Sequence, residues 1–266
     1  MNMPRLYCRY VGISLRGQMQ YRLSFVMHAT GHFLITALEF LAFAAVFQRF
    51  GHINGWTLPQ MALFYGIISV AFAATEAVAR GFDVFNRLIK AGDFDRVLVR
   101  PRPAAFQVLS QELQLMRIGR FAQGVIVLVW ASSRLDIDWS VSSVFLLLAA
   151  IAGGICLFAG LFVVQAALCF WTTESIEILN CTTYGGVETA QFPLSIYRPW
   201  FRIFFTFVIP LATINYLPIH ALLNIDDALG STRLMQWLSP LAGIIFLWVC
   251  LRFWSFGVRH YTSTGS

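Results

Sequence analysis

Apolar segments of about 20 residues recur along the chain, separated by short charged stretches. A helix of that length rises 1.5 Å per residue and therefore spans the hydrocarbon core of a bilayer, which is about 30 Å thick. Only 12% of the 266 residues are charged, whereas a soluble domain carries about 25%. The chain has too little polar surface to cover a core in water, so we expect a single transmembrane domain over residues 1–266.

The fold class predicted is an all-α membrane protein with six transmembrane helices. Backbone polar groups in lipid must be satisfied within a helix or a closed barrel, and the apolar segments lack the two-residue alternation of barrel strands. The predicted spans are roughly Leu23–Phe47, Gln60–Ala79, Gly119–Ser132 within a longer helix beginning after Pro103, Val141–Trp171, Phe192–Pro210 and Trp237–Phe256.

Residues 1–22 predict an N-terminal amphipathic helix that lies at the membrane interface. Four apolar residues, each four positions after the last, form one stripe, and arginines occupy another face. The stripe consists of Tyr7, Val11, Leu15 and Met19.

The segment between the fifth and sixth predicted spans, residues 211–236, is too apolar for an ordinary loop. Pro210 and Pro218 interrupt it, and irregular backbone at membrane depth is tolerated where protein buries it. We therefore predict a re-entrant or surface-lying pair of short helices on the outer side.

The basic residues predict the orientation of the chain. Lys and Arg are enriched in cytoplasmic loops, and an N-terminus inside leaves only Arg49, Arg134 and Arg233 of the 19 basic residues outside. The basic residues predicted to lie on the cytoplasmic side then include Arg198 and Arg202. We expect a multi-pass protein of the bacterial cytoplasmic membrane with both termini in the cytoplasm. The same distribution explains the net charge of +6, so membrane lipids are expected as partners and nucleic acid is not.

The most charged stretch is the inner loop over residues 80–103. Phe82, Phe85 and Ile89 recur at helical spacing and predict a short amphipathic helix, which Gly92 closes in a left-handed conformation. Two interpretations remain open. The apolar face seats in a groove on a partner protein, or the helix lies on the headgroups with its arginines against anionic lipid.

Three motifs resemble those of one transporter family. Residues 88–103, LIKAGDFDRVLVRPRP, are similar to a hallmark of type-2 ABC exporter permeases, with an apolar pair, Gly, Asp, one residue, Asp and a Leu-x-Arg-Pro ending. Residues 192–218 resemble the family's Tyr-Pro entry and IP…NYxP exit, and residues 254–266 resemble its C-terminal ending. Phe192 replaces the commoner Tyr, and Arg102 stands where leucine is usual.

The resemblance implies a dimer of permease subunits, each docked through residues 80–103 onto a cytoplasmic ABC ATPase dimer. The second permease is a related chain or an identical copy, and the cargo is amphipathic or hydrophobic. ATP and Mg²⁺ belong to the ATPase, and no cofactor binds this chain directly. The docking residues expected are Phe82, Phe85, Arg87, Gly92, Asp93, Asp95, Arg96 and Arg100.

The chain is not expected to be an enzyme. A P-loop needs a Gly-Lys pair, and the single lysine, Lys90, follows Ile89. His28 and His32 are four residues apart on a predicted helix, but they lack a third ligand, so no metal site is expected.

Two acidic residues in the predicted spans, Glu39 and Glu76, are candidates for the translocation path. A carboxylate at the centre of a membrane helix costs about 3 kcal/mol, so such groups face a bundle interior or a wet path. The alternative for Glu39 is a hydrogen-bonded packing role, and for Glu76 an i,i+4 ion pair with Arg80.

Three other functions remain as alternatives. A gradient-driven carrier predicts an inverted repeat, which the sequence does not show. An ABC importer permease predicts an EAA-type loop, which is not recognisable near Glu76. An intramembrane enzyme predicts a nucleophile motif or paired aspartates within a span, and neither is found.

Overall fold

The computed structural model describes residues 3–172, 176–225 and 230–262, and these ranges consist of helices joined by short connections. Within them, the only β pairing is an isolated bridge between Ile53 and Trp56. Five helices are long and apolar enough to cross a membrane, or six if one bent pair is counted as a span. The five are α2 (Arg22–Phe50), α3 (Leu58–Asp83, continuous in direction to Lys90), α7 (Ile118–Arg134, preceded by η1, Leu115–Arg117), α8 (Val141–Leu168) and α13 (Leu241–Arg259).

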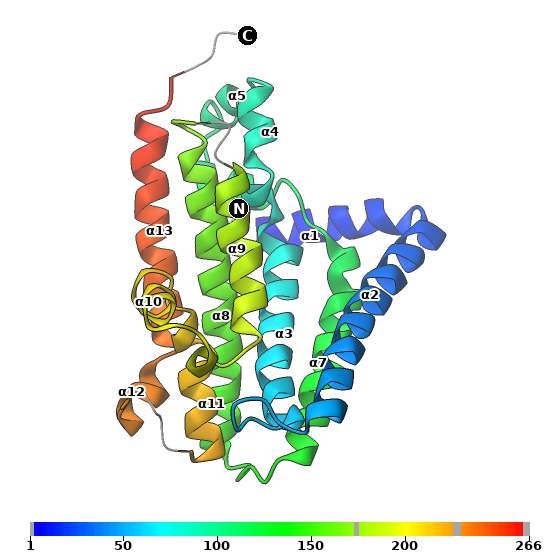
Figure 1. The fold of residues 1–266 in the computed structure, drawn as a ribbon. Helices are drawn as coiled ribbons and strands as arrows, with labels where there is room; N and C mark the ends of the chain where they lie inside the picture. The colour runs from blue at the N-terminus through cyan, green and yellow to red at the C-terminus, as the bar shows by residue number, and fades with distance from the viewer. Residues whose placement is uncertain (1–2, 173–175, 226–229, 263–266) are drawn as a thin grey trace.

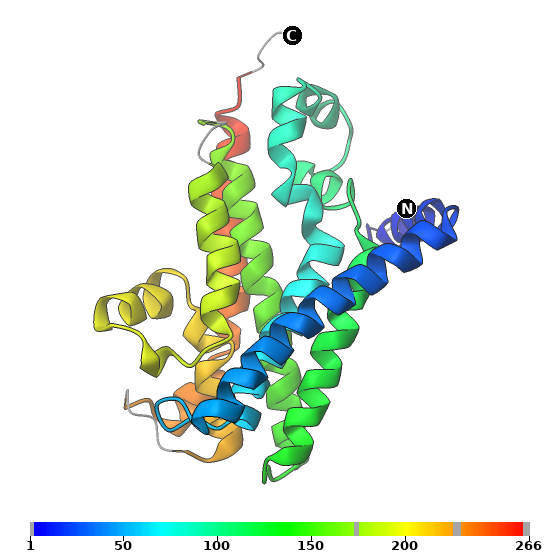
Figure 2. The ribbon, with the colours of Figure 1, turned by 45° about the vertical axis from the view of Figure 1, so that its right-hand side comes forward.

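Helix α3 occupies the centre of the bundle (Figure 1). Its residues 61–73 are nearly all apolar and are all buried, as expected for a helix surrounded by other helices. It packs against α7 on one side and α8 on the other, and α13 packs along α8. Helix α2 lies outside this group and crosses α7 obliquely (Figure 2).

Local signals in the sequence set where α3 and α8 begin. Thr57 and Gln60 form a capping box at the start of α3, with the Thr57 amide donating to Gln60 Oε1 at 2.9 Å. The Ser140 hydroxyl accepts from the Ser143 amide at the start of α8. These side chains satisfy amides that have no partner within the helix.

Four of the predicted spans match long helices to within a few residues. They are α2, α3, α7 and α8, which correspond to the first four predicted spans. The sixth predicted span is shifted, because a short helix, α12 (Arg233–Leu238), ends before Pro240 and α13 begins only at Leu241.

The prediction that the third helix begins just after Pro103 is wrong. Residues 104–109 form a separate short helix, α6 (Ala104–Leu109), and the chain turns before η1 and α7. Helix α6 packs across the end of α3, where a side chain at Gly81 would overlap the carbonyl oxygen of Val108. The Gln114 amide then donates to Ala77 O at 3.2 Å, so contacts with α3, not a helix continuation, fix this connection.

The fifth predicted span is also wrong. Instead of one helix, residues 192–210 contain the 3₁₀ turn η2 (Leu194–Ile196), α10 (Pro199–Ile203) and the π-helical turn η3 (Phe204–Val208), which run across the bundle axis (Figures 1 and 2). Prolines lack an amide donor and interrupt a helix. The helix that packs beside α8 and α3 is α9 (Ile176–Ala190). Its 15 residues span about 22 Å.

The predicted pair of short helices after Pro210 is present. The turn η4 (Leu211–Thr213) leads into α11 (Tyr216–Leu223), at 75° to the preceding Pro199–Val208 segment, and α12 follows. The part of this segment at residues 226–229 lies outside the described residues. Helix α11 is largely buried, as are Leu211 and Ala212 of η4, so protein covers the break between the two helical segments.

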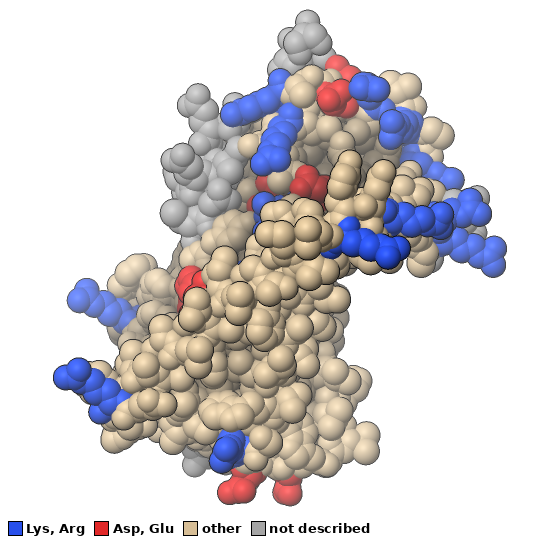
Figure 3. Space-filling model, turned by 90° about the vertical axis from the view of Figure 1, so that its right-hand side faces the viewer, with Lys and Arg blue, Asp and Glu red and all other residues tan. Residues whose placement is uncertain are grey.

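The basic residues gather at one end of the bundle, as Figure 3 shows for the face bearing α1 and α2. Arg198 and Arg202 do not lie at that end, which corrects the predicted distribution. The Trp56 indole donates to Ser195 Oγ at 3.2 Å, which places the start of α10 beside the α2–α3 connection. Arg202 lines a cavity with Tyr216 of α11.

The N-terminal helix predicted over residues 1–22 is observed as α1 (Met3–Met19), which lies across the bundle (Figure 1). The side-chain amide nitrogen of Gln18 donates to Leu113 O at 2.6 Å, and the backbone amide of Leu115 donates to Gln18 Oε1 at 3.2 Å. These bonds attach α1 to the connection before α7. Its location in the membrane interface remains a prediction.

Replacing Gly243 by alanine tests the close crossing of α13 and α8. A methyl group there would overlap the carbonyl of Gly153, where α13 meets α8, so we expect a loss of about 1–3 kcal/mol in the free energy of unfolding. Thermal unfolding in detergent, followed by tryptophan fluorescence, measures it. Gly31→Ala is the control, because a methyl group there meets no atom within 4 Å. Equal unfolding temperatures for the two variants would contradict the packing described.

Candidate functional site

Two short helices form a hairpin at the end of α3, on the basic side of the bundle (Figure 1). They are α4 (Phe85–Lys90) and α5 (Phe94–Leu98). Gly92 joins them with φ of 70°, which confirms the left-handed conformation predicted for this residue. The amide of Asp93 donates to Leu88 O at 3.1 Å and closes α4.

The apolar face of the hairpin packs against its own chain. Phe85 and Phe94 are fully buried, with ring centroids 5.1 Å apart, and Phe85 lies 4.9 Å from Trp254 of α13. We call the whole group the aromatic clamp, and its edge-to-face pairs add specific geometry to the burial of apolar surface. Its members are Phe82, Phe85, Phe94, Phe170, Trp254 and Tyr261.

The clamp buries two of the predicted docking residues. Phe82 and Phe85 contact this chain rather than solvent, so their side chains are not available to a partner. The charged face is the one left open. The Arg96 guanidinium, which is exposed, pairs with Asp93 at 3.1 Å, and the Val99 side chain at the end of the hairpin is 86% exposed.

The remaining predicted docking residues lie on or beside this face. Arg87 and Arg100 are exposed, as is the neighbouring Lys90, and Asp95 is half-buried. The structure therefore brings the predicted charged residues together on one small protruding surface.

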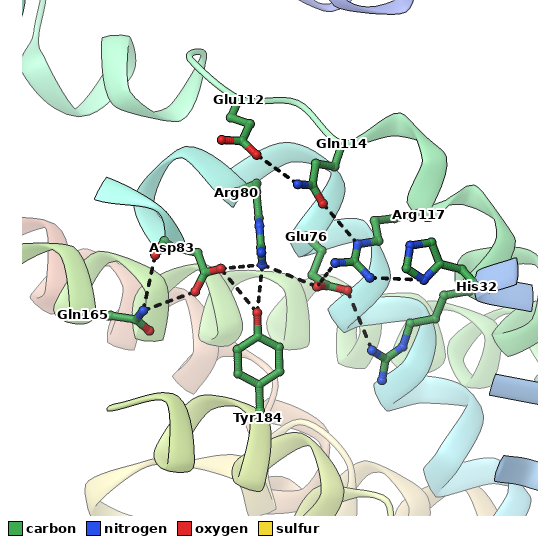
Figure 4. A network of polar contacts seen from close by, with 10 residues as sticks. His32, Glu76, Arg80, Asp83, Glu112, Gln114, Arg117, Gln165 and Tyr184 are labelled. Carbon is green, nitrogen blue, oxygen red and sulfur yellow. Dashed lines mark hydrogen bonds and ion pairs between the residues drawn. The ribbon is translucent and has the colours of Figure 1, made fainter. Parts of the chain in front are cut away.

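A network of buried ion pairs lies below the hairpin (Figure 4). Its centre is Glu76, whose side chain is 1% exposed. Arg117 approaches Glu76 Oε1 at 3.1 Å and Arg80 approaches it at 3.8 Å. Arg120 lies 3.8 Å from the other carboxylate oxygen, with its guanidinium 5.0 Å from the ring centroid of Phe72. Three cations thus surround one buried carboxylate.

Asp83 is the second carboxylate of the network. It pairs with Arg80, which also donates to Tyr184 Oη at 2.8 Å, and the Tyr184 hydroxyl donates to Asp83 at 3.3 Å. Gln165 donates to Asp83 Oδ1 at 3.3 Å. Through these bonds α3 is joined to α8 and α9.

The network connects most of the helices that meet α3 at this end. Arg117 also lies 3.4 Å from His32 Nδ1 of α2. A buried charge is stable only when it is paired and hydrogen-bonded, so removing one member leaves others uncompensated. The arrangement fixes α2, α7, α8 and α9 relative to the helix that carries the hairpin.

Of this network, the sequence predicts only the Glu76–Arg80 pair. The signal for more was present, because Glu76, Arg80 and Asp83 follow one another at i, i+4 and i+7 and share a helix face. Arg117 of η1 and Arg120 of α7, three residues apart, supply the complementary charges. Their positions in the sequence alone predict only the orientation of the chain.

The structure does not bring the two candidate path residues into contact. Glu39 is exposed on the surface of α2, whereas Glu76 is enclosed by arginines. A role of either residue in translocation stays a prediction.

Among the described residues, no group of three or more His, Cys, Asp and Glu side chains is placed to hold a metal ion. Of the two histidines in α2, His32 contacts Arg117.

Residues 33–265 match the family described as ABC-2 family transporter protein. This range runs from within α2 through the hairpin, α8 and α13. Comparison with curated proteins and with solved structures gave no match.

Replacing Glu76 by glutamine tests the buried network. The substitution leaves Arg117 and Arg120 without their buried counter-charge, so we expect a loss of about 3–5 kcal/mol in the free energy of unfolding. Thermal unfolding in detergent measures it.

Two further variants serve as controls. Glu112→Gln, at the half-buried edge of the network, should cost less than about 1 kcal/mol. Adding Arg117→Gln to Glu76→Gln should recover part of the loss, because one uncompensated cation is removed. A Glu76→Gln variant as stable as the parent protein would rule out the ion pairs as a structural centre.

Proposed function

The chain belongs to the ABC-2 transporter family, and on that premise we propose that it is the membrane-spanning permease subunit of an ABC exporter driven by a separate ATPase. The observation that carries this proposal is the family match over residues 33–265. The chain's single lysine, Lys90, follows Ile89, so a P-loop of the Gly-Lys type has no place in this sequence. Energy then comes from ATP and Mg²⁺ bound to the partner.

In this proposal the end that carries the hairpin faces the cytoplasm of a bacterial cell. The gathering of basic side chains at that end supports it (Figure 3), because cytoplasmic loops are enriched in Lys and Arg. Helix α1 and the C-terminal end of α13 lie toward the same end (Figure 1), so both termini are then cytoplasmic.

The hairpin of α4 and α5 is the proposed docking element. Its open face combines exposed cations, among them Arg87 and Lys90, with the apolar side chains of Leu98 and Val99 at its end. Such a surface suits a partner groove with an apolar floor and an acidic rim, since complementary charge fixes partner choice and register.

The attachments of the hairpin suit it to transmit motion. The aromatic clamp joins it to α8 and α13, and the network of Glu76 joins the adjoining part of α3 to α2, α7 and α9. Movement of the ATPases would therefore displace whole helices rather than a loose loop. We propose that two such permeases, identical or related, line the path between them.

An amphipathic or hydrophobic cargo fits the membrane-facing surface. An apolar groove of about 440 Å³ runs between α2 and α7, lined by residues such as Phe40, Leu41, Ile126 and Trp130. Lateral entry from lipid needs an apolar surface of this kind. Glu39, exposed on α2, remains a candidate contact for a polar or cationic part of the cargo.

Affinity purification tests the proposal. The tagged chain should retain a distinct polypeptide with a Walker-type P-loop, and proteoliposomes that hold both should hydrolyse ATP faster than the ATPase alone. Purified permease that moves cargo down an ion gradient without such a companion would overturn the proposal.

Reversing two charges of the hairpin tests whether its basic face binds the ATPase. The double variant Arg87→Glu with Lys90→Glu should lower the affinity for the ATPase by about tenfold or more, because like charges then meet across the interface. The amount of ATPase retained with the tagged chain measures this. The matched control, Arg49→Glu with Arg134→Glu, changes the same charge at the opposite end and should retain the ATPase. Equal retention by the two variants would exclude the basic face of the hairpin from docking.

A further inference from the structure

A cavity of about 290 Å³ lies between α1 and the chain that follows the hairpin. Arg100 and Arg102 line it together with Gln107, and Tyr10 of α1 closes another side. Leu6 and Phe106 supply an apolar wall. The cavity is therefore polar and basic on one side and apolar on the other.

The two arginines of this cavity have no counter-charge. Both are exposed, and among the described residues no carboxylate lies within ion-pair distance of either. This differs from Arg80, Arg96, Arg117 and Arg120, which all pair with acids. Two neighbouring guanidinium groups facing one cavity suit a phosphate, whose oxygens accept several hydrogen bonds from them.

Gln107 fixes the backbone beside the two arginines. Its side-chain amide nitrogen donates to Val97 O and to Arg102 O, each at 2.9 Å. These bonds tie the segment that carries Arg100 and Arg102 to α6, so the basic wall of the cavity has a defined backbone.

The surroundings place the cavity at the boundary between the apolar belt and the basic end. Val11 and Leu15 of α1 line an apolar groove of about 400 Å³ with Phe25 and Phe121. Figure 3 shows most of the basic side chains above this level and a largely uncharged belt directly below it, with a few charged side chains at the left edge and at the bottom. Lipid headgroups occupy such a boundary.

We propose that this cavity binds the headgroup of an anionic phospholipid. Arg100 and Arg102 contact the phosphate, and the apolar wall of Leu6 and Phe106 contacts the apolar part of the lipid beside it, features that phosphatidylglycerol provides. Basic pockets on the cytoplasmic side of membrane helices bind such headgroups. Only the choice of the inner leaflet rests on the proposed function. The lipid would hold α1 against the segment that leads out of the hairpin.

Native mass spectrometry of the full chain in detergent tests this inference. The chain is titrated with dioleoylphosphatidylglycerol and, separately, with dioleoylphosphatidylcholine, and the phosphatidylglycerol should bind more tightly. The double variant Arg100→Gln with Arg102→Gln should weaken phosphatidylglycerol binding by about 25-fold, because a basic residue near anionic lipid contributes about fivefold. Arg100→Lys with Arg102→Lys keeps the charge and should retain most of the affinity, which also reports that the loop still folds.

The matched control is Arg9→Gln with Arg16→Gln. Both arginines are exposed on α1, and neither lines the cavity. Equal weakening by the two glutamine pairs would assign the binding to diffuse surface charge and overturn the proposal. Equal affinity for phosphatidylcholine would do the same. Soluble glycerol phosphate is the third probe, and tight binding of this compound in place of the lipid would assign the cavity to a free phosphate ester.

Discussion

A single carboxylate in the interior of the bundle, that of Glu76, organises the helices around it. Burying an ion costs several kcal/mol unless partners surround it, and here Arg80, Arg117 and Arg120 do so from two different helices. Arg117 in turn contacts His32, and Arg80 donates to Tyr184. Residues of α2 and α9 therefore also take part in holding the buried charges. The helix that carries Glu76 is thereby fixed in position and rotation relative to its neighbours. Apolar packing alone, which has many near-equivalent arrangements in lipid, specifies such a register less strictly.

The same end of α3 carries two different kinds of attachment. The ion network fixes its last turns, and the aromatic clamp seats the hairpin that follows on α8 and α13. Phe85 and Phe94 bury the apolar face of the hairpin against its own chain. In the proposed function a partner would therefore meet mainly charged side chains and Val99, so docking would be sensitive to charge, whereas the transmission of movement would depend on the buried rings. The two properties reside in different residues and can be changed separately.

Four of the long helices and the turn at Gly92 could be predicted from the sequence, because each depends on local apolar length or on one residue's conformational freedom. The prediction of spans failed where the apolar character of a segment did not match its place in the bundle. Helix α9 carries acidic and amide residues in its sequence and so lacks the apolar signal of a span, whereas residues 192–210 have that signal but are broken by prolines and lie across the bundle. The buried network required Arg117 to approach Glu76 from 41 positions away, and a single sequence holds no direct record of such tertiary pairing.

The proposal that the hairpin binds a nucleotide-hydrolysing partner can be tested most directly by site-specific photo-crosslinking in cells. A photoreactive residue placed at Val99, the most exposed apolar position of the hairpin, should form a covalent product with a cytoplasmic protein that contains a P-loop. The same residue placed at Trp139, in the connection between α7 and α8 at the opposite end, should not. A P-loop protein captured from Trp139 and not from Val99 would contradict both the docking surface and the orientation.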